Sequence, residues 1–161
     1  MVSVSQTWGD NEARFVCVKL RFRSVCFRTS SVYALNMNPE RNDFLKAILP
    51  LFDPLSANVI GGDFNSVPDI SRDHLGGNPS EHYNSTVGLQ RLVRSSSTVD
   101  VWRAVHPNVQ AFTWSNRSST ISSRIDLMFC HVNWLSCVSS SHIIPCPLWR
   151  PITAKIHSSQ H

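Results

Sequence analysis

The sequence predicts one layered domain of mixed α/β or α+β class. Its 161 residues suffice for a single hydrophobic core and are few for two domains. With 42% hydrophobic and 16% charged residues, the composition is that of a globular chain rather than a disordered one. Short apolar segments typical of strands alternate with a few segments of helical spacing and with turn signals. This succession favours sheets with helices packed against them.

The first elements are predicted to be a strand pair and a helix. Residues 14–20 have the β-branched, alternating pattern of a strand, and residues 25–34 follow as its partner after a turn at 23–24. Asn38 is expected to be the N-cap of a helix, because proline and an acidic residue follow it directly. Apolar side chains at helical spacing extend this helix to about Asp53.

The middle of the chain is predicted to hold one short strand, a loop and two helices. Residues 58–60 form an apolar strand that ends at a pair of glycines. Residues 69–79 are polar and glycine-rich, which indicates a loop. A helix is expected over residues 87–93, and a shorter helical segment over residues 99–105, which ends before a His-Pro pair.

The last third of the chain is predicted to be mostly strand. The expected strands cover residues 111–114, 121–130, 138–144 and 151–156.

The charge distribution is compatible with a polyanionic partner. The net charge is +4 and the isoelectric point is about 9.0. Residues 51–100 hold six acidic and three basic side chains, whereas both ends of the chain are basic. An acidic metal site that faces a phosphate backbone would have this pattern, and so would chance variation among surface charges.

Cysteine usage and the absence of targeting segments indicate a reducing compartment. The five cysteines are an odd number without a C-x-x-C pair, so we expect free thiols that act as small apolar core residues. No secretory signal and no apolar run of bilayer length is visible. We therefore expect an intracellular protein, nuclear or cytoplasmic, that is monomeric, not secreted and without membrane contact.

The sharpest chemical signal is the run Gly61-Gly62-Asp63-Phe64-Asn65. Asp63 and Asn65 are two positions apart, so in an extended chain their side chains face the same side. The glycines allow another backbone or a phosphate to come close. A carboxylate beside a carboxamide can orient an attacking water and hold a hard cation such as Mg²⁺. The alternative is a simple turn, because Asp and Asn both satisfy turn backbones well.

Two further segments carry polar groups inside apolar surroundings. In Ser123-Arg124-Ile125-Asp126, the side chains of Arg124 and Asp126 would lie on one face of a strand, and a surface ion pair of little energetic weight is the alternative. The segment that runs from Asp100-Val101-Trp102-Arg103 through His106-Pro107 to Phe112-Thr113-Trp114 is interpreted, by chemistry alone, as aromatic packing with one hydroxyl.

In their order along the chain, these segments resemble the endonuclease/exonuclease/phosphatase superfamily. More narrowly, they resemble the endonuclease domain of LINE-type (non-LTR) retrotransposons. The resemblance covers nearly the whole chain, and D-V-W-R-x-x-H-P followed by F-T-W and S-R-I-D is typical of the retroelement branch. The matching segments are V-Y-A at 32–34, E-R at 40–41, G-G-D-F-N at 61–65, the segment 100–114 and S-R-I-D at 123–126.

The resemblance implies a metal-dependent phosphodiesterase on a DNase I-like, two-sheet α/β sandwich flanked by helices. Such an enzyme nicks DNA to expose a primer for reverse transcription, so the implied partner is DNA and the implied cofactor is Mg²⁺ or Mn²⁺. Asp63 would hold the metal and activate the attacking water, and Asn65 would position the phosphate. Tyr33 would contact the scissile phosphate, and Asp126 would orient a catalytic histidine. The side chains expected to contact nucleic acid are Thr113 and Arg124.

Two features of the family pattern are missing. The family begins with strands that carry an Asn and a metal-binding Glu, and neither Glu12 nor Glu40 stands in such a context. The family also ends with Ser-Asp-His before its last strand, whereas residues 143–152 keep only the flanks, and His142 and His157 stand elsewhere. We therefore expect residues 1–161 to be one partial domain with impaired or no activity, because loss of one such electrostatic group costs roughly 10²–10³ in rate. Missing strands would also expose a sheet edge.

Three alternatives to a competent nuclease remain open from the residues. The chain could be a nucleic-acid-binding remnant without catalysis, or a translated relic without a selected role. Stacking on bases would use its tryptophans, although core packing is the simpler interpretation of Trp102, Trp114, Trp134 and Trp149. A zinc site would use residue types that suit Zn²⁺ at spacings that do not fit a zinc knuckle, namely Cys130, Cys137, His142 and Cys146.

Overall fold

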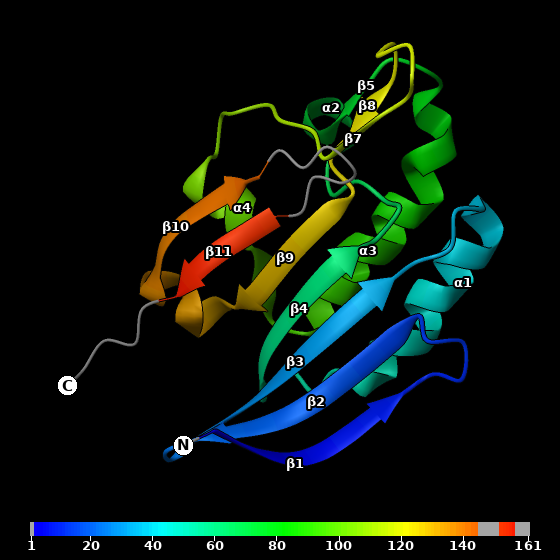
Figure 1. The fold of residues 1–161 in the computed structure, drawn as a ribbon. Coiled ribbons are helices and arrows are strands. Elements are labelled where there is room, and N and C mark those ends of the chain that lie inside the picture. The colour runs from blue at the N-terminus through cyan, green and yellow to red at the C-terminus, as the bar shows by residue number, and fades with distance from the viewer. Residues whose placement is uncertain (1, 145–151, 157–161) are drawn as a thin grey trace.

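The computed structural model describes residues 2–144 and, as the backbone of a strand, residues 152–156 (Figure 1). Within these residues the main sheet has six strands in the order β1-β2-β3-β4-β9-β6. All neighbouring pairs are antiparallel except β3 and β4, which are parallel. The strands are β1 (Val2–Gly9), β2 (Phe15–Phe22), β3 (Val25–Tyr33), β4 (Ala57–Asp63), β6 (Thr98–Asp100) and β9 (Asp126–His131).

Two helices cover one face of this sheet, and a second sheet lies over the other. The helices are α1 (Asn38–Ile48) and α3 (Tyr83–Ser95), and the second sheet pairs β10 (Val138–Ile143) with β11 (Ile152–Ile156) next to β9 (Figure 1). The predicted two-sheet α/β sandwich flanked by helices is therefore confirmed. A third, small sheet in the order β5-β8-β7 joins His74–Leu75, Ser122–Ser123 and Trp114–Ser115.

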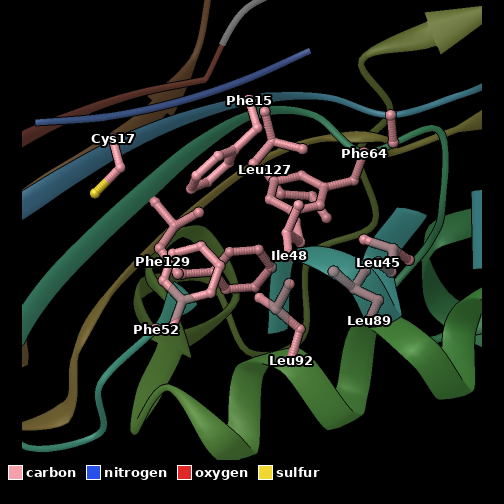
Figure 2. Packing of buried hydrophobic residues seen from close by; sticks show 13 residues of the cluster. Phe15, Cys17, Leu45, Ile48, Phe52, Phe64, Leu89, Leu92, Leu127 and Phe129 are labelled. Carbon is pink, nitrogen blue, oxygen red and sulfur yellow. The ribbon is translucent and has the colours of Figure 1, made fainter. Parts of the chain in front are cut away.

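The core lies between the main sheet and the two helices. Leu45 and Ile48 of α1 and Leu89 and Leu92 of α3 are buried against aromatic side chains from the sheet (Figure 2). Helical spacing places these four residues on the faces that the helices turn toward the sheet. The aromatic rings meet edge to face, with Phe64 and Phe129 5.4 Å apart between centroids and Phe15 and Phe52 5.7 Å apart.

The predicted strand pair and first helix are present, with one correction at the helix start. The register of β2 and β3 runs from Phe15↔Val32 to Phe22↔Val25, so the turn lies where it was expected. The N-cap of α1 is Met37, without a side-chain cap, and Asn38 is already helical. The prediction that Asn38 caps the helix was therefore wrong by one residue. The helix continues as a 3₁₀ turn over Leu49–Leu51, close to the expected end.

The segment predicted as a loop at 69–79 holds regular structure. It forms α2 (Ile70–Asp73), capped by the side chain of Asp69 on the backbone amide of Ser71, and then strand β5. A 3₁₀ helix, η2 (Pro79–His82), leads into α3. The polar composition concealed these elements because two of the polar side chains, Asp73 and His74, are buried rather than solvated.

The remaining predicted elements need smaller corrections. The segment 99–105 divides into β6 and α4 (Val101–Val105), with the side chain of Asp100 capping the helix. The strand expected at 111–114 is largely irregular, and β7 begins only at Trp114. The strand expected at 121–130 is broken between β8 and β9 by Arg124 and Ile125, whose backbone turns toward other partners.

The outermost strand, β1, was not expected. It is mostly exposed and pairs only with β2, which leaves its other edge unpaired within the described residues. A bulge between Val4 and Gln6 shifts the register of its pairing with β2.

No helix of the described residues is long and apolar enough to cross a bilayer.

The free thiols differ in their burial. Cys17 and Cys130 are buried, as expected for apolar core residues, whereas Cys26 is exposed. Burial raises the pKa of both buried thiols.

Candidate active site

Strand register brings three of the predicted site residues into one row. Tyr33 of β3 stands opposite Asp63 of β4, and Asp63 stands opposite Asp126 of β9. Directly paired residues share one face of a sheet, so the phenol and the two carboxyl groups are neighbours. Tyr33 is half exposed and Asp126 is buried. The site therefore opens on the side of β3.

The turn after β4 places Asn65 beside this row. The Asp63 carboxylate accepts a hydrogen bond from the backbone amide of Asn65 at 2.8 Å. Asn65 adopts a left-handed conformation with φ of 46°. The Asn65 side chain donates to the carbonyl of Ala34 at 2.8 Å, which ties the turn to the end of β3. The run is thus both the turn and the polar cluster that were considered as alternatives.

Gly62 is required for this arrangement. Its φ is 143°, and a Cβ atom at this position would lie 1.9 Å from the carbonyl oxygen of Val32. Only glycine therefore lets β4 approach β3 closely enough to align Asp63 with Tyr33. A Cβ atom at Gly61 would come no closer than 3.8 Å to its neighbours.

The electrostatics of the row favour a cation. The pKa of Asp63 is raised to about 6, chiefly by burial; the hydrogen bond from the backbone amide of Asn65 lowers it, and the charge of Asp126 contributes to the rise. Arg41 of α1 opposes this rise by its charge. A divalent cation held by Asp63 would offset this negative charge, since hard cations prefer oxygen ligands.

The residues present fit such a cation only in part. Asp63 and Asp126 offer carboxylates, and Mg²⁺ is often held by one or two carboxylates together with substrate phosphates. No cluster of three or more His, Cys, Asp or Glu suited to a metal occurs among the described residues. The alternative zinc site is therefore not supported by Cys130, Cys137 and His142, and Cys146 lies outside the described residues.

Arg124 forms the centre of a buried ion network that the sequence had not indicated. Its guanidinium donates to both carboxylate oxygens of Asp73, at 2.8 and 3.0 Å, and to Asp100 at 2.6 Å. Arg103 joins the network through Asp73 at 2.6 Å. Burial would lower the pKa of Arg124, but the bonds to Asp73 and the charge of Asp100 outweigh it and raise the pKa.

This placement corrects two expectations for Arg124. The Arg124 side chain is fully buried, so it cannot contact nucleic acid directly. For the same reason it is not half of a surface ion pair with Asp126. Its partners bind it in a dry environment where an arginine fork fits a carboxylate in two places. Arg124 instead anchors the backbone two residues before Asp126.

Thr113 is likewise a buried positioning residue rather than an exposed one. Its hydroxyl oxygen accepts hydrogen bonds from the backbone amides of Ile125 and Asp126, both at 3.1 Å. The expected direct contact of Thr113 with a DNA backbone does not fit this burial. Trp114, the next residue, is about half exposed.

The tryptophans divide between packing and exposure. Trp102 is buried, with the guanidinium groups of Arg103 and Arg124 5.0 and 5.2 Å from its ring centre, which confirms core packing there. Trp134 packs edge to face on Phe27. Trp149, and with it the expected position of the missing Ser-Asp-His motif, lies outside the described residues.

Comparison with known proteins decides the family. The model of the endonuclease/exonuclease/phosphatase family matches residues 13–158. The chain belongs to this family. The resemblance drawn from the sequence is thereby confirmed, and the family match includes all of the site residues described above.

Individual relatives agree with this assignment. The chain is 34% identical over 135 residues, 81% of its length, to the Transposon TX1 uncharacterized 149 kDa protein of Xenopus laevis, of which it spans 10%. An AP endonuclease from Archaeoglobus fulgidus superposes with a TM-score of 0.76 at 14% identity, over 97% of this chain and 72% of that one. The endonuclease domain of TRAS1, a telomere-specific non-LTR retrotransposon, superposes with a TM-score of 0.66 at 14% identity. The superposition covers 96% of this chain and 70% of that one.

A Neisseria 3′ phosphatase bound to a product DNA hairpin has the same fold. Its TM-score is 0.74 at 16% identity, over 97% of this chain and 72% of that one. At these identities the solved structures establish the fold alone, so the chemistry has to be argued from the side chains of this chain.

Sequence reasoning missed Asp73, Asp100, Arg103 and Arg41 as parts of the site's framework. Arg124 was the signal that could have found the first two, because an arginine within an apolar segment needs buried carboxylates as partners. The predicted loop at 69–79 contains two acids, and only folding shows that Asp73 is the one that Arg124 meets.

Proposed function

We propose that this chain is a metal-dependent DNA endonuclease domain of retrotransposon origin, which nicks phosphodiester bonds and whose activity is impaired in the present sequence. The observation that carries the proposal is the row of Tyr33, Asp63 and Asp126 beside Asn65, on a fold that belongs to the endonuclease/exonuclease/phosphatase family. The transposon relative supports the retroelement origin, and the Neisseria phosphatase with its DNA hairpin supports DNA as the substrate.

Each side chain has a role that its position allows. Asp63, with its pKa of about 6, is a general base suited to neutral pH and accepts a proton from the attacking water. Asn65 orients the phosphate through its carboxamide, and the exposed Tyr33 hydroxyl donates to a phosphoryl oxygen. Asp126 is held in place by Thr113 and lies next to Asp63, where it adds negative charge to the site.

A divalent cation, Mg²⁺ or Mn²⁺, would be held by Asp63 and would stabilise charge on the phosphoryl oxygens. Without it, two neighbouring carboxylates repel an anionic substrate. The chain's own residues then provide alignment, through the Asn65 turn and the Thr113 bonds, and proton transfer at Asp63.

The expected impairment follows from the sequence. No Ser-Asp-His triplet occurs in the chain. Groups that stabilise transition-state charge contribute roughly 10²–10³ each in rate, although such losses need not add. We therefore expect slow, metal-dependent nicking at high protein concentration rather than efficient turnover.

Nicking of supercoiled plasmid with and without Mg²⁺ tests the proposal. Three folded proteins are compared: the parent chain, Asp63→Ala, and Asp43→Ala as a control in which an exposed acid far along α1 is removed. Slow nicking that requires Mg²⁺, disappears in Asp63→Ala and persists in Asp43→Ala supports an impaired nuclease. Equal nicking in both variants, or rapid nicking by the parent, contradicts the assigned site or the assigned impairment.

A nucleic-acid-binding remnant is the second candidate, favoured by the exposed Trp114 next to the site and by the net charge of +4. It predicts DNA affinity that falls steeply with added salt, without nicking in any of the three proteins. No affinity at low salt would remove this candidate.

A further inference from the structure

A cavity of about 330 Å³ lies beside the candidate active site and shares only Asn65 with the residues of the proposed chemistry. Asn65 and Ile125 form its side toward the site. Its other walls come from the start of α1, from the small sheet β5-β8-β7 and from η2. The polar side chains that carry the following argument are Arg41, His74, Glu81 and His82.

Arg41 brings a positive charge to this cavity and has no direct ion-pair partner among the described residues. Burial lowers its pKa, and the charge of Asp63 opposes this lowering. The side chain is buried, and its guanidinium donates to the carbonyls of Leu35 and Asn36 and to the Ser85 hydroxyl. No Asp or Glu of the described chain lies within ion-pair distance of it. Buried charges in proteins are generally paired, so this one fits a site whose counter-charge is an anionic ligand.

Two histidines extend the polar wall. The rings of His74 and His82 are 4.5 Å apart between centroids. His74 is more than nine-tenths buried, with Nδ1 bonded to the Ser123 hydroxyl at 2.9 Å. Its Nε2 atom and the Nδ1 atom of His82 are buried and have no partner among the described residues. Both nitrogens can donate to a ligand oxygen once protonated.

The opposite wall is apolar and aromatic. Trp114 is half exposed at the edge of the small sheet, and Ile121 and Ile125 continue the surface toward the site. An indole face beside cationic and imidazole groups suits a nucleotide, with its base or sugar on the ring and its phosphate on the charged wall.

We propose that this cavity is a second phosphate subsite, which binds a phosphodiester of the DNA strand next to the one at Asp63 and takes up a proton on His82 as it binds. The identity of the ligand as DNA rests on the proposed function. The subsite itself does not require cleavage, because the groups assigned to bind the second phosphate, Arg41, His74 and His82, have no role in the proposed cleavage.

The charged and titratable groups that face the histidine pair determine the sign of the pH effect. Burial lowers the pKa of His82, and the charges of His74 and Arg41 lower it further, whereas the exposed Glu81 raises it. A bound phosphodiester adds a negative charge and raises this pKa. Affinity therefore increases as pH falls from 8.0 to 5.5, because the complex binds a proton that the free protein does not hold at pH 8.0.

A binding experiment isolates this effect. A fluorescent single-stranded oligonucleotide is titrated at pH 8.0 and pH 5.5 in EDTA, with Asp63→Asn as the background of every protein. Phosphodiesters do not titrate in this range, and the background removes both cleavage and the titration of Asp63. Added to it are His82→Gln and, as a matched control, His142→Gln, which changes an exposed histidine of β10.

We expect the background protein and the His142→Gln control to bind roughly fivefold or more tightly at pH 5.5 than at pH 8.0, which is within the usual range of coupling between two binding events. His82→Gln should lose most of this ratio while it retains the far-ultraviolet circular dichroism of a folded chain. In the background protein, the His82 ring protons should report a higher pKa with oligonucleotide than without it.

Three results would each overturn the subsite. The ratio of affinities at pH 5.5 and pH 8.0 could stay unchanged in His82→Gln, it could fall equally in His142→Gln, or the pKa of His82 could fail to rise on binding. This outcome is separable from the endonuclease test. Nicking that depends on Asp63 without pH-coupled binding would sustain the nuclease and reject the subsite. Coupled binding without nicking would do the reverse.

Discussion

At the scale of single residues, Asp63 combines a raised pKa with a central place in the site. Its folded-state pKa of about 6 lies above its ordinary value of 3.8, chiefly because of burial. The folded chain therefore holds a proton that the unfolded chain releases between about pH 4 and pH 6. Stability contributed by this group is present below that window and is lost as pH rises through it. The site thus stores a destabilising charge, as functional sites often do.

Asp63→Asn should consequently stabilise the fold at pH 8 and have little effect at pH 4. Because Asp63 is partly exposed and solvent screens its charge, we expect a gain of roughly 1–2 kcal/mol at pH 8. Urea unfolding of the parent and the variant at both values measures it, with Asp43→Asn as a control at an exposed acid. A gain of the same size at both pH values, or a loss at pH 8, would show that the charge of Asp63 is not destabilising.

Thr113 determines where Asp126 lies, because its hydroxyl oxygen accepts hydrogen bonds from the backbone amides of both Ile125 and Asp126. Thr113→Val keeps the shape of the side chain and leaves both buried amides without an acceptor. The expected cost is about 1–3 kcal/mol for each amide, measured by urea unfolding. Thr113→Ser retains the oxygen and should lose less than half as much. Equal losses in the two variants would mean that packing of the methyl group, not hydrogen bonding, accounts for the effect.

At the scale of elements, β3 and β4 can pair in their observed register only because Gly62 has no side chain. Gly62→Ala would force a Cβ atom against the Val32 carbonyl at a φ of 143°, so we expect a loss of several kcal/mol or failure to fold. Gly61→Ala, one residue earlier, meets nothing closer than 3.8 Å and should cost about 1 kcal/mol or less. Thermal denaturation of the pair tests the difference, and similar midpoints would contradict the assigned close approach.

The buried ion network links α2, α4 and the segment between β8 and β9. Asp73→Asn removes the charge that Arg124 and Arg103 share and leaves a buried guanidinium without its bidentate partner. Breaking such a pair costs roughly 3–5 kcal/mol. The exposed pair of Lys46 and Asp43 is the natural comparison, and Asp43→Asn should cost no more than about 1 kcal/mol. Comparable losses in the two variants would indicate that the network is solvated.

At the scale of the whole molecule, β1 has an edge that no described strand pairs with, and it exposes apolar side chains. Val4 pairs with Leu20, which pairs with Phe27, and Val2 pairs with Phe22, so one face of the three strands carries an apolar surface. Val2 and Val4 are more than half exposed. Such an edge is a template for association between chains.

Self-association should therefore depend on protein concentration and respond to charge on β1. We expect Val4→Lys to lower the light scattering of concentrated samples markedly, with a change in unfolding free energy below about 0.5 kcal/mol because the side chain is exposed. Val109→Lys, at a similarly exposed valine in an irregular segment, controls for net charge. An equal reduction in both variants would assign the effect to charge rather than to the strand edge.

The sequence by itself determined features that depend on local spacing and residue chemistry. The β2–β3 pair, α1 and the end of β4 follow from apolar periodicity and turn residues, which act over a few positions. Residue type pointed to Asp63 and Asn65, but the extended chain assumed for them is a left-handed turn at Asn65 in the structure. The order of the short motifs along the chain likewise indicated the family. This order can be recognised without knowing which strands become neighbours.

Only the tertiary structure decided which distant groups meet. Tyr33, Asp63 and Asp126 became one row through the register of three strands, and a shift of one residue would have turned a side chain to the other face. Arg124 and Thr113 proved to be buried positioning residues because their partners lie far along the chain, with Asp73 51 positions from Arg124. Local pattern cannot show whether a polar side chain is solvated or paired, since that depends on what the rest of the chain packs against it.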